Sequence, residues 1–339
     1  MIAVGVDTHK AAHYAVALDN VGQLLGELSF TASAAGYAKL CDWAMRLVAS
    51  QEVVFGVEGI GSWGAGVCDH LQAAGQHVVE VERPRRRDRR AGKSDRIDAL
   101  AAAKSVLSGE HLSTPRRRGV LSVIRALLIA RRSAVGERTR VLNQLQAVLA
   151  TAPVALRERV GSGTGKQLER RIIAMRVAAN SDSHARAIFG VMRDLALRSR
   201  ALANDAQRYE RELAALVRSV DETLLDEPGI GPISAAKLLA CDPSRFTHEA
   251  AFARCNGTAP LPASSGQTVR HRLNRGGDRQ ANNAIHTIAI IRAKHQPETR
   301  AYLERRISEG KTKREALRAL KRHISRDIYK RLADLPLTS

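Results

Sequence analysis

The stretch IAVGVDTHK, residues 2–10, opens with a short apolar, β-branched run and delivers a carboxylate at Asp7. The stretch VVFGVEG, residues 53–59, repeats this pattern and delivers Glu58. Such runs are typical of buried strands. Each acid stands where its run stops, which is where a buried sheet opens to solvent. The sequence therefore predicts two carboxylates at the open edge of a sheet.

The stretch KSDRIDA, residues 93–99, supplies two more carboxylates. Asp95 and Asp98 are spaced i, i+3, so they share one face if DRIDALAAAKSVL is helical. Mg²⁺ prefers hard oxygen ligands of this kind. Two ions roughly 4 Å apart can stabilise both the attacking and the leaving oxygen of a phosphoryl transfer. We therefore predict a magnesium-dependent phosphodiester site built from Asp7, Glu58, Asp95 and Asp98.

Each acid taken alone also has a structural interpretation. Asp7 could cap a turn, and Glu58 could pair with an arginine. Asp95 could be a helix N-cap with Asp98 in the first turn, where the helix dipole favours a negative charge. The four acids together, with strands between them and a strongly basic remainder of the chain, favour the catalytic interpretation.

Residues 2–82 show the order strand, strand, strand, helix, strand, helix, strand. Three hairpin-joined strands followed by α/β alternation indicate a ribonuclease-H-like, or RuvC-like, fold. The first and fourth strands would lie side by side in that fold, which gives Asp7 and Glu58 a reason to meet. We expect this α/β catalytic domain to occupy residues 1–152.

The charge of the 339-residue chain is +20 and is unevenly distributed. Residues 1–82 carry nine acidic and three basic side chains, so the basic excess lies in the rest. This division suits a polyanionic substrate, although charge can also serve solubility alone. The four cysteines show no zinc or disulfide spacing, and no apolar run reaches the 18 residues of a membrane span. We expect a protein of the reducing cytoplasm with no membrane partner.

The segment RPRRRDRRAGKSDR, residues 83–96, holds eight basic side chains against two acidic ones. Such clusters are often only solvated loops. Because this one leads directly into Asp95, we predict that it grips nucleic-acid phosphates. The side chains concerned are Arg85, Arg86, Arg87, Arg89, Arg90 and Lys93.

Two long helical segments follow, at about 119–150 and 183–220. The second is amphipathic and highly charged, so we expect a coiled-coil-like strut or dimer arm, with a core helix as the alternative. A proline and the stretch GSGTG lie between the two segments and mark a boundary. We assign residues 153–222 to a helical, coiled-coil-like region and residues 223–339 to a mainly α-helical domain.

The stretch LLDEPGIGPISAAKLLA, residues 224–240, predicts a helix-hairpin-helix. Gly229 and Gly231 would let backbone amides approach a phosphate at a helix N-terminus. An ordinary tight turn between two helices is the alternative.

The segment from Gly257 to Gly277 lacks secondary-structure periodicity and contains Ser264 and Ser265 beside a glycine. Serines beside glycine are common turn residues. A serine can nonetheless attack phosphorus when its proton is withdrawn or cations hold its oxygen. Four arginines in and after this segment could hold phosphate oxygens: Arg270, Arg272, Arg275 and Arg279.

Over nearly its whole length the chain resembles the DEDD transposases of the insertion sequence 110 family, also called bridge-RNA-guided recombinases. GVDTHK, VEGIGSWG and KSDRIDA are similar to the family's DEDD domain. PGIGPISAAKLLA, FARCNGTAPLPASSGQTVRHR and GGDRQANNAI are similar to its serine-bearing domain. Matched by position, the family's acids fall on Asp7, Glu58, Asp95 and Asp98, and its catalytic serine falls on Ser265.

The resemblance implies a magnesium-dependent enzyme that acts on donor and target DNA and forms a covalent phosphoserine link to a cut strand. It also implies guidance by a non-coding bridge RNA and assembly as a dimer of dimers. In such an assembly one protomer supplies the acids of a composite site and another supplies the serine. A bacterial, nucleoid-associated protein is expected on the same basis. After Ser265 the chain reads Gly-Gln-Thr-Val, so an accessory hydroxyl would depend on Thr268.

Two other functions stay open at this point. A related site-specific DNA invertase would share both motifs and differ in the arrangement of its DNA sites. A non-catalytic nucleic-acid-binding protein could retain the fold, although the intact acids and Ser265 argue against it.

Overall fold

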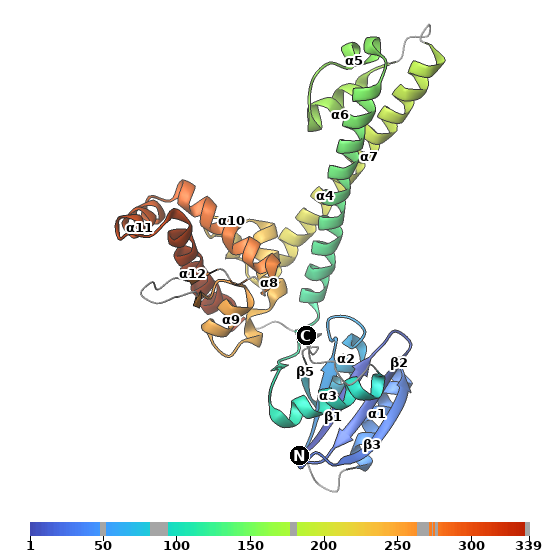
Figure 1. Cartoon of the computed structure of the whole chain (residues 1–339), viewed down its shortest axis with the longest axis vertical. Helices are drawn as coiled ribbons and strands as arrows, with labels where there is room; N and C mark the ends of the chain where they lie inside the picture. The colour runs from blue at the N-terminus through green and yellow to red at the C-terminus, as the bar shows by residue number, and fades with distance from the viewer. Residues whose placement is uncertain are drawn as a thin grey trace. The chain divides into compact units, whose positions relative to one another are not determined.

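The computed structural model describes residues 1–47, 52–81, 94–176, 182–262, 271–272, 274 and 277–335. The chain divides into the compact units Met1–Arg117 and Arg118–Ser339. The first unit is a mixed α/β sheet with helices on it, and the second is mostly helical (Figure 1). This is the coarse division predicted from the sequence, an α/β part followed by a mainly α part.

The N-terminal unit is built on a sheet whose described strands follow the order β3-β2-β1-β4-β5-β6. Its elements are β1 (Ile2–Thr8), β2 (Ala12–Leu18), β3 (Leu24–Thr31), α1 (Ala34–Arg46), β4 (Val53–Glu58), α2 (Ala65–Ala73), β5 (His77–Val81), α3 (Asp95–Ser108) and β6 (Leu112–Ser113). β1, β4 and β5 are parallel, whereas β2, β3 and β6 are joined by antiparallel pairing. The prediction that the first and fourth strands lie side by side is confirmed, since β1 pairs with β4.

The two faces of this sheet have different partners, because side chains alternate along a strand. Ile2, Val4 and Val6 of β1 share one core with α1 and α2. Ala3 lies on the opposite face, in a core with α3. Gly5 faces α3 as well, and the next position on that face of β1 is Asp7.

Two glycines let α3 lie very close to this second face. A Cβ atom at Gly5 would lie 2.1 Å from the backbone oxygen of Ala99, and one at Gly56 would lie 2.5 Å from Cγ2 of Val106. Real Cβ atoms do not approach other atoms so closely, because overpacking forces a backbone shift. The absence of a side chain at Gly5 and at Gly56 therefore sets how closely α3 packs on β1 and β4.

The C-terminal unit is mostly helical in its described residues. Its elements are α4 (Val120–Thr151), α5 (Val154–Val160), α6 (Gly165–Ala174), α7 (Ser183–Val220), η2 (Leu224–Asp226), α8 (Pro232–Cys241), η3 (Pro243–Arg245), α9 (Glu249–Cys255), β7 (Leu261–Pro262), β8 (His271–Arg272), α10 (Arg279–His295), α11 (Pro297–Ser308) and α12 (Lys313–Leu332). The two long helices predicted from the sequence are confirmed as α4 and α7.

α4 and α7 form an antiparallel pair (Figure 1). At one end Leu121 packs in the same core as Val217, and at the other end Leu145 packs in the same core as Phe189. The strut predicted for residues 183–220 therefore pairs with a helix of its own chain. α5 and α6 close the tip of this pair.

A buried carboxylate links three of these helices. Glu169 of α6 accepts a hydrogen bond from Oγ of Ser199 on α7 at 2.6 Å. It also pairs with Arg138 of α4 at 3.3 Å. Removing one partner of such a buried pair is costly, because it leaves the other charge uncompensated. The contact therefore fixes the tip helix α6 against both long helices.

The segment predicted as the first helix of a helix-hairpin-helix is a single 3₁₀ turn, η2, which corrects that prediction. α7 ends at Val220, and the carboxylate of Asp221 accepts from the backbone N–H of Thr223 at 3.1 Å. Pro228 disfavours the helical conformation at the residue before it. Only Glu227 lies between η2 and Pro228, so the turn has no room to extend into an α-helix.

α4 packs with the C-terminal unit, since the units divide at Arg117 and Arg118. The finer division into residues 1–152, 153–222 and 223–339 stays a prediction. Within the described part of the chain, no helix combines the length and the apolar character that crossing a membrane requires.

Candidate active site

The carboxyl end of β1 places Asp7 at the edge of the sheet. Asp7 is only 3% exposed. Alternation along the strand puts Asp7 on the same face as Gly5, the face on which α3 lies. The close approach of α3 at Gly5 therefore brings the first turn of that helix toward Asp7.

The first turn of α3 carries Asp95 and Asp98, as the i, i+3 spacing predicts. The N-cap is Ser94, whose side chain accepts from the backbone N–H of Ile97 at 3.3 Å. Asp95 is therefore not the N-cap, and its carboxylate is available for other contacts. That side chain is 63% exposed.

His9 joins the strand end to the helix start. Its Nε2 lies 3.0 Å from Oδ2 of Asp7 and 3.2 Å from Oδ1 of Asp95. Ligand atoms of Asp7, His9 and Asp95 all lie within 4.8 Å of one another, so this group could hold a metal ion. Our sequence prediction did not include His9. Its position two residues after Asp7, on the same side of the chain, is the signal that could have identified it.

His9 is itself fixed by a second histidine. Its backbone N–H donates to Nδ1 of His13 at 3.2 Å. His13 is buried and stacks on Tyr37, with 5.8 Å between the ring centroids and 4° between the ring planes. Burial is the main cause that lowers the pKa of His13, which favours the neutral ring that accepts this bond. The buried ring of His13 thereby holds the loop after β1 in place.

Glu58 occupies the matching position on β4. The paired residues Val6 and Val57 precede Asp7 and Glu58, so the two acids follow neighbouring positions of parallel strands. Glu58 is 3% exposed, and its backbone oxygen accepts from Oγ1 of Thr8 at 3.0 Å. Neither Glu58 nor Asp98 belongs to the close group of Asp7, His9 and Asp95. The structure thus brings the four predicted acids to one sheet edge, with two of them in the close group.

The electrostatic surroundings of Asp7 favour a cation. Burial raises the pKa of Asp7 most, and the negative charges of Asp98 and Asp95 raise it further, whereas His9 lowers it. A carboxylate that is costly to ionise among other carboxylates is stabilised by an added positive charge. Carboxylate oxygens are also the donors that hard divalent cations select. The residues present therefore fit a divalent metal ion.

A side-chain network outside the acids ties the start of α3 to the sheet. Nε of Arg96 donates to Oε1 of Glu27 on β3 at 2.6 Å, and the hydroxyl of Tyr14 on β2 donates to Oε2 of the same carboxylate at 2.5 Å. Arg96 lies between Asp95 and Asp98 in the sequence. Glu27 therefore holds the turn that carries both acids.

Ser264 and Ser265 lie outside the described residues. So do eight of the predicted nucleic-acid-binding residues: Arg85, Arg86, Arg87, Arg89, Arg90, Lys93, Arg270 and Arg275. Arg272 ends β8 and Arg279 begins α10. β7 and β8 pair antiparallel on either side of residues 263–270, a short ladder that the sequence pattern does not indicate.

The predicted phosphate-binding glycines lie in the turn before α8. Gly229 has a φ of +82°, and a Cβ atom there would lie 3.2 Å from the backbone oxygen of Ile288. Nε of Arg292 donates to the backbone oxygen of Pro228 at 2.8 Å. Gly229 therefore has a structural requirement of its own in packing against α10. Gly231 is the N-cap of α8, and no atom lies within 4 Å of an ideal Cβ there.

Two family models match this chain. The model for the DEDD transposase domain of IS110, described as a transposase, matches residues 4–152. The model described as transposase of the IS116/IS110/IS902 family matches residues 221–304. Together the matches span more than two thirds of the chain and both regions that carry predicted catalytic residues.

Curated relatives agree with these matches. The insertion element IS900 uncharacterized 42 kDa protein of Mycobacterium paratuberculosis is 26% identical, over 97% of this chain and 95% of that protein. The mini-circle putative transposase for IS117 of Streptomyces coelicolor is 26% identical, over 90% of this chain and 87% of that protein. The insertion element IS116 uncharacterized 44.8 kDa protein of Streptomyces clavuligerus is 27% identical, over 81% of this chain and 80% of that protein.

Proposed function

We propose a mechanism from one premise: this chain belongs to the IS110 family of DEDD transposases and is an enzyme that recombines DNA. In this mechanism the acids of the N-terminal unit hold Mg²⁺, and Ser265 is the nucleophile. A non-coding bridge RNA pairs with donor and target DNA. The order of the strands and the position of the acids on β1 and β4 support a ribonuclease-H-like fold for the N-terminal unit.

Asp7, Glu58, Asp95 and Asp98 are the residues that would hold the metal, with His9 beside them. Bound there, Mg²⁺ would neutralise charge on the phosphate and polarise its phosphorus–oxygen bonds. Asp7 contributes a buried carboxylate whose pKa is raised by burial and by neighbouring acids. His9 contacts both carboxylates and so holds Asp7 of β1 close to Asp95 of α3.

Ser265 is the proposed nucleophile. Its Oγ forms a bond to phosphorus as one phosphorus–oxygen bond of the strand breaks. The serine loses its hydroxyl proton, and the released strand end takes up a proton as a hydroxyl. In the second step a strand hydroxyl attacks the phosphoserine, and Ser265 recovers its proton. One ester bond is exchanged for another at each step, so religation needs no external energy source.

The distribution of charge supports a nucleic-acid substrate on the C-terminal side. Residues 270–330 contain 17 basic and six acidic side chains. Such an excess neutralises backbone phosphates and does not itself specify sequence. Selection by a pairing RNA is consistent with a protein that reads mainly backbone. Assembly as a dimer that forms a tetramer on DNA would let the acids of one protomer act with the serine of another.

The observation that carries the proposal is the meeting of Asp7 and Asp95 at His9. It joins two motifs that are 88 positions apart in the sequence into one group of potential metal ligands. The test is to incubate the full chain with labelled donor DNA, its RNA and Mg²⁺, and to look for a protein–DNA adduct that survives denaturation. We expect an adduct with the unaltered chain and none with Ser265→Ala.

The neighbouring serine provides the matched control. Ser264→Ala makes the same chemical change one residue away and should leave the adduct in place. An adduct that persists in Ser265→Ala and disappears in Ser264→Ala would move the nucleophile to Ser264. Absence of any adduct under conditions in which the DNA recombines would exclude a covalent serine mechanism.

A further inference from the structure

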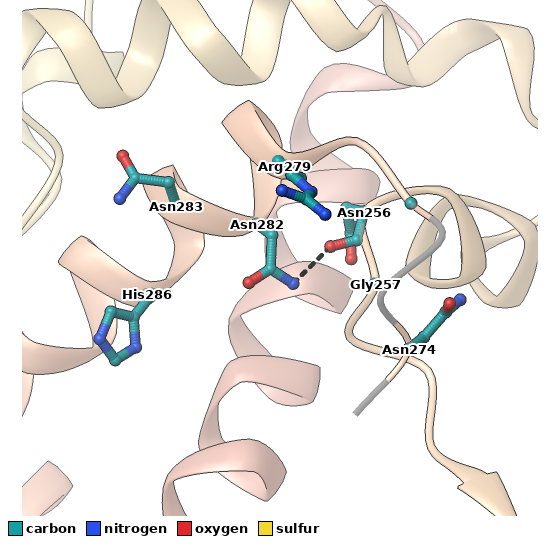
Figure 2. Close-up of a pocket in the computed structure, with 8 residues that line it drawn as sticks. Asn256, Gly257, Asn274, Arg279, Asn282, Asn283 and His286 are labelled. Atoms are coloured by element: carbon teal, nitrogen blue, oxygen red, sulfur yellow. Dashed lines mark hydrogen bonds between the residues drawn. The ribbon is translucent and has the colours of Figure 1, made fainter. Parts of the chain in front are cut away.

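The C-terminal unit contains a cavity of about 450 Å³ that is lined by polar side chains and glycines. We call it the hairpin-root pocket, because the chain leaves it at Gly257 toward β7 and returns from β8 through Asn274. It lies between α10 and the turn after α9 (Figure 2). Its lining residues are Asn256, Gly257, Asn274, Gly277, Arg279, Asn282, Asn283 and His286. These described lining residues include no carboxylate.

The floor of the hairpin-root pocket is fixed by hydrogen bonds. Asn256 is fully buried, and its Nδ2 donates to Oγ of Ser325 on α12 at 2.8 Å. The backbone oxygen of Asn256 accepts from Nδ2 of Asn282 at 2.7 Å (Figure 2). A Cβ atom at Gly277 would lie 2.1 Å from the backbone oxygen of Cys255. Hydrogen bonds and close packing therefore hold the backbone that bounds the pocket in place.

The edge of the pocket offers hydrogen-bond donors. Oδ1 of Asn283 accepts from Nζ of Lys237 at 2.7 Å, which orients the amide with its N–H groups available. Among the described residues, Nδ2 of Asn283, the guanidinium of Arg279 and the ring of His286 have no hydrogen-bond partner. All three side chains belong to α10 (Figure 2). Three donor groups of one helix therefore border the same cavity.

A buried cation stands behind this edge. Lys321 of α12 is 7% exposed, and its Nζ donates to Oδ1 of Asn282 at 2.8 Å. Among the described residues no carboxylate pairs with it. Burial lowers the pKa of Lys321, and burial and the nearby Lys321 lower the pKa of His286. A buried ammonium without a counter-ion is stabilised by an anion close by.

We propose that the hairpin-root pocket binds one nucleotide of a nucleic-acid strand, with its phosphodiester held by Arg279, Asn283 and His286. The donors fit an oxyanion such as a phosphate, and the assignment to a nucleic-acid strand rests on the proposed function. The volume exceeds the need of a phosphate alone and leaves room for the adjoining sugar or base. Gly257 and Asn274 of the lining lie in the sequence on either side of Ser265, the proposed nucleophile.

The test measures binding of the full chain to labelled duplex DNA, single-stranded DNA and RNA of one sequence, by fluorescence anisotropy in the presence of a chelator. Asn283→Asp replaces a donor with a carboxylate of the same shape. We expect it to weaken binding by about tenfold, since hydrogen bonds to charged groups carry free energies of that order. Gln280→Glu makes the same change of charge on an exposed side chain of α10 that does not line the pocket, and should change affinity less than about twofold, because a single exposed charge is largely screened.

Comparison of the three nucleic acids shows which strand supplies the phosphate. Weakening for DNA alone assigns the pocket to the DNA, weakening for RNA alone assigns it to the guide, and equal weakening assigns it to either backbone. Asn283→Asp and Gln280→Glu with equal affinities in all three arms would overturn the proposal. If Asn283→Asp loses its cooperative melting transition, Arg279→Gln decides, because that side chain is exposed. It should lower the salt slope by about one unit for at least one of the three nucleic acids, and unchanged slopes in all three arms would again overturn the proposal.

These outcomes are separate from those of the proposed function. Binding in chelator requires no chemistry, whereas the serine adduct requires it. A pocket-dependent affinity without any adduct would remove the serine mechanism and leave the pocket. An adduct with no effect of Asn283→Asp on affinity would do the reverse.

Discussion

The acid edge of the N-terminal unit and the hairpin-root pocket of the C-terminal unit are opposite in chemical character. At the acid edge, Asp7 and Asp95 meet at His9, and the pKa of Asp7 is raised by burial and neighbouring acids. At the pocket, donors face a cavity whose described lining has no carboxylate, with Lys321 behind it. A cation would stabilise the first surface, and an anion would stabilise the second. Phosphoryl transfer on DNA needs both, since the metal and the phosphate carry opposite charge.

The largest effect should come from removing a ligand at the acid edge. Asp7→Asn keeps the shape of the side chain and removes its charge. We expect adduct formation and recombination to fall by at least about 100-fold, since loss of even the outer partners of a metal site costs 10–100-fold. Affinity for DNA and RNA should change little, which is measured by anisotropy. Asp42→Asn, an exposed change on α1 of the same unit, should keep activity. Equal activity of the two variants would contradict the metal site.

A change in the sheet should break the same edge indirectly. Gly5→Ala places a methyl group where the backbone oxygen of Ala99 lies 2.1 Å away, so α3 must move from the sheet. We expect the free energy of unfolding to fall by about 3 kcal/mol, in the upper range for overpacking, and activity to fall with it. Gly61→Ala is the matched control, because no atom lies within 4 Å of an ideal Cβ there. Thermal denaturation of both variants checks this, and equal stabilities would show that α3 tolerates displacement.

The tie between α3 and the sheet should matter less. Glu27→Gln weakens the contacts with Arg96 and Tyr14 and leaves every predicted ligand in place. Because the pair is partly exposed, we expect only a small loss in stability. Recombination should fall by about two- to fivefold, since the tie positions the turn that carries Asp95 and Asp98 and one exposed ion pair has that order of energy. Glu110→Gln, an exposed change after α3, should have no effect. A loss equal in both variants would remove the positioning role of Glu27.

The smallest expected effect is on the pH dependence of stability without divalent metal. Burial raises the folded-state pKa of Asp7 above its ordinary value of 3.8. Its contribution to stability is therefore fully present below that value and is lost as pH rises through the raised pKa. Asp7→Asn lacks this loss, so its melting temperature relative to the unaltered chain should be higher at pH 7 than at pH 4. A difference that is constant between these pH values would contradict the cost of ionising Asp7.

The sequence patterns predicted the acid edge better than they predicted the pocket. Asp7 and Glu58 end strands of clear periodicity, and Asp95 and Asp98 share a helical face, so local spacing is informative. His9 was missed because its role depends on α3 arriving within reach, which the glycines at positions 5 and 56 permit.

The hairpin-root pocket has no local signature. It forms where the turn after α9, the return from β8 and the start of α10 meet, and Lys321 of α12 donates to its lining residue Asn282. None of these contacts follows from a period of 2 or 3.6. The 3₁₀ turn at η2 was mispredicted for a different reason, since the weight of the local signals at Asp221 and Pro228 was underestimated. Contacts between distant segments decide the pocket, and Asp221 also pairs with Arg331 far along the chain at 2.7 Å.

Thermal denaturation with and without Mg²⁺ tests most directly whether the acid edge binds a divalent cation. A ligand that binds only the folded state at 100 times its dissociation constant adds about 2.7 kcal/mol to stability. We expect Mg²⁺ to raise the melting temperature of the unaltered chain and of Asp42→Asn by several degrees. The melting temperatures of Asp7→Asn and Asp95→Asn should rise by much less. An equal rise in all four proteins would place the metal elsewhere and contradict the account.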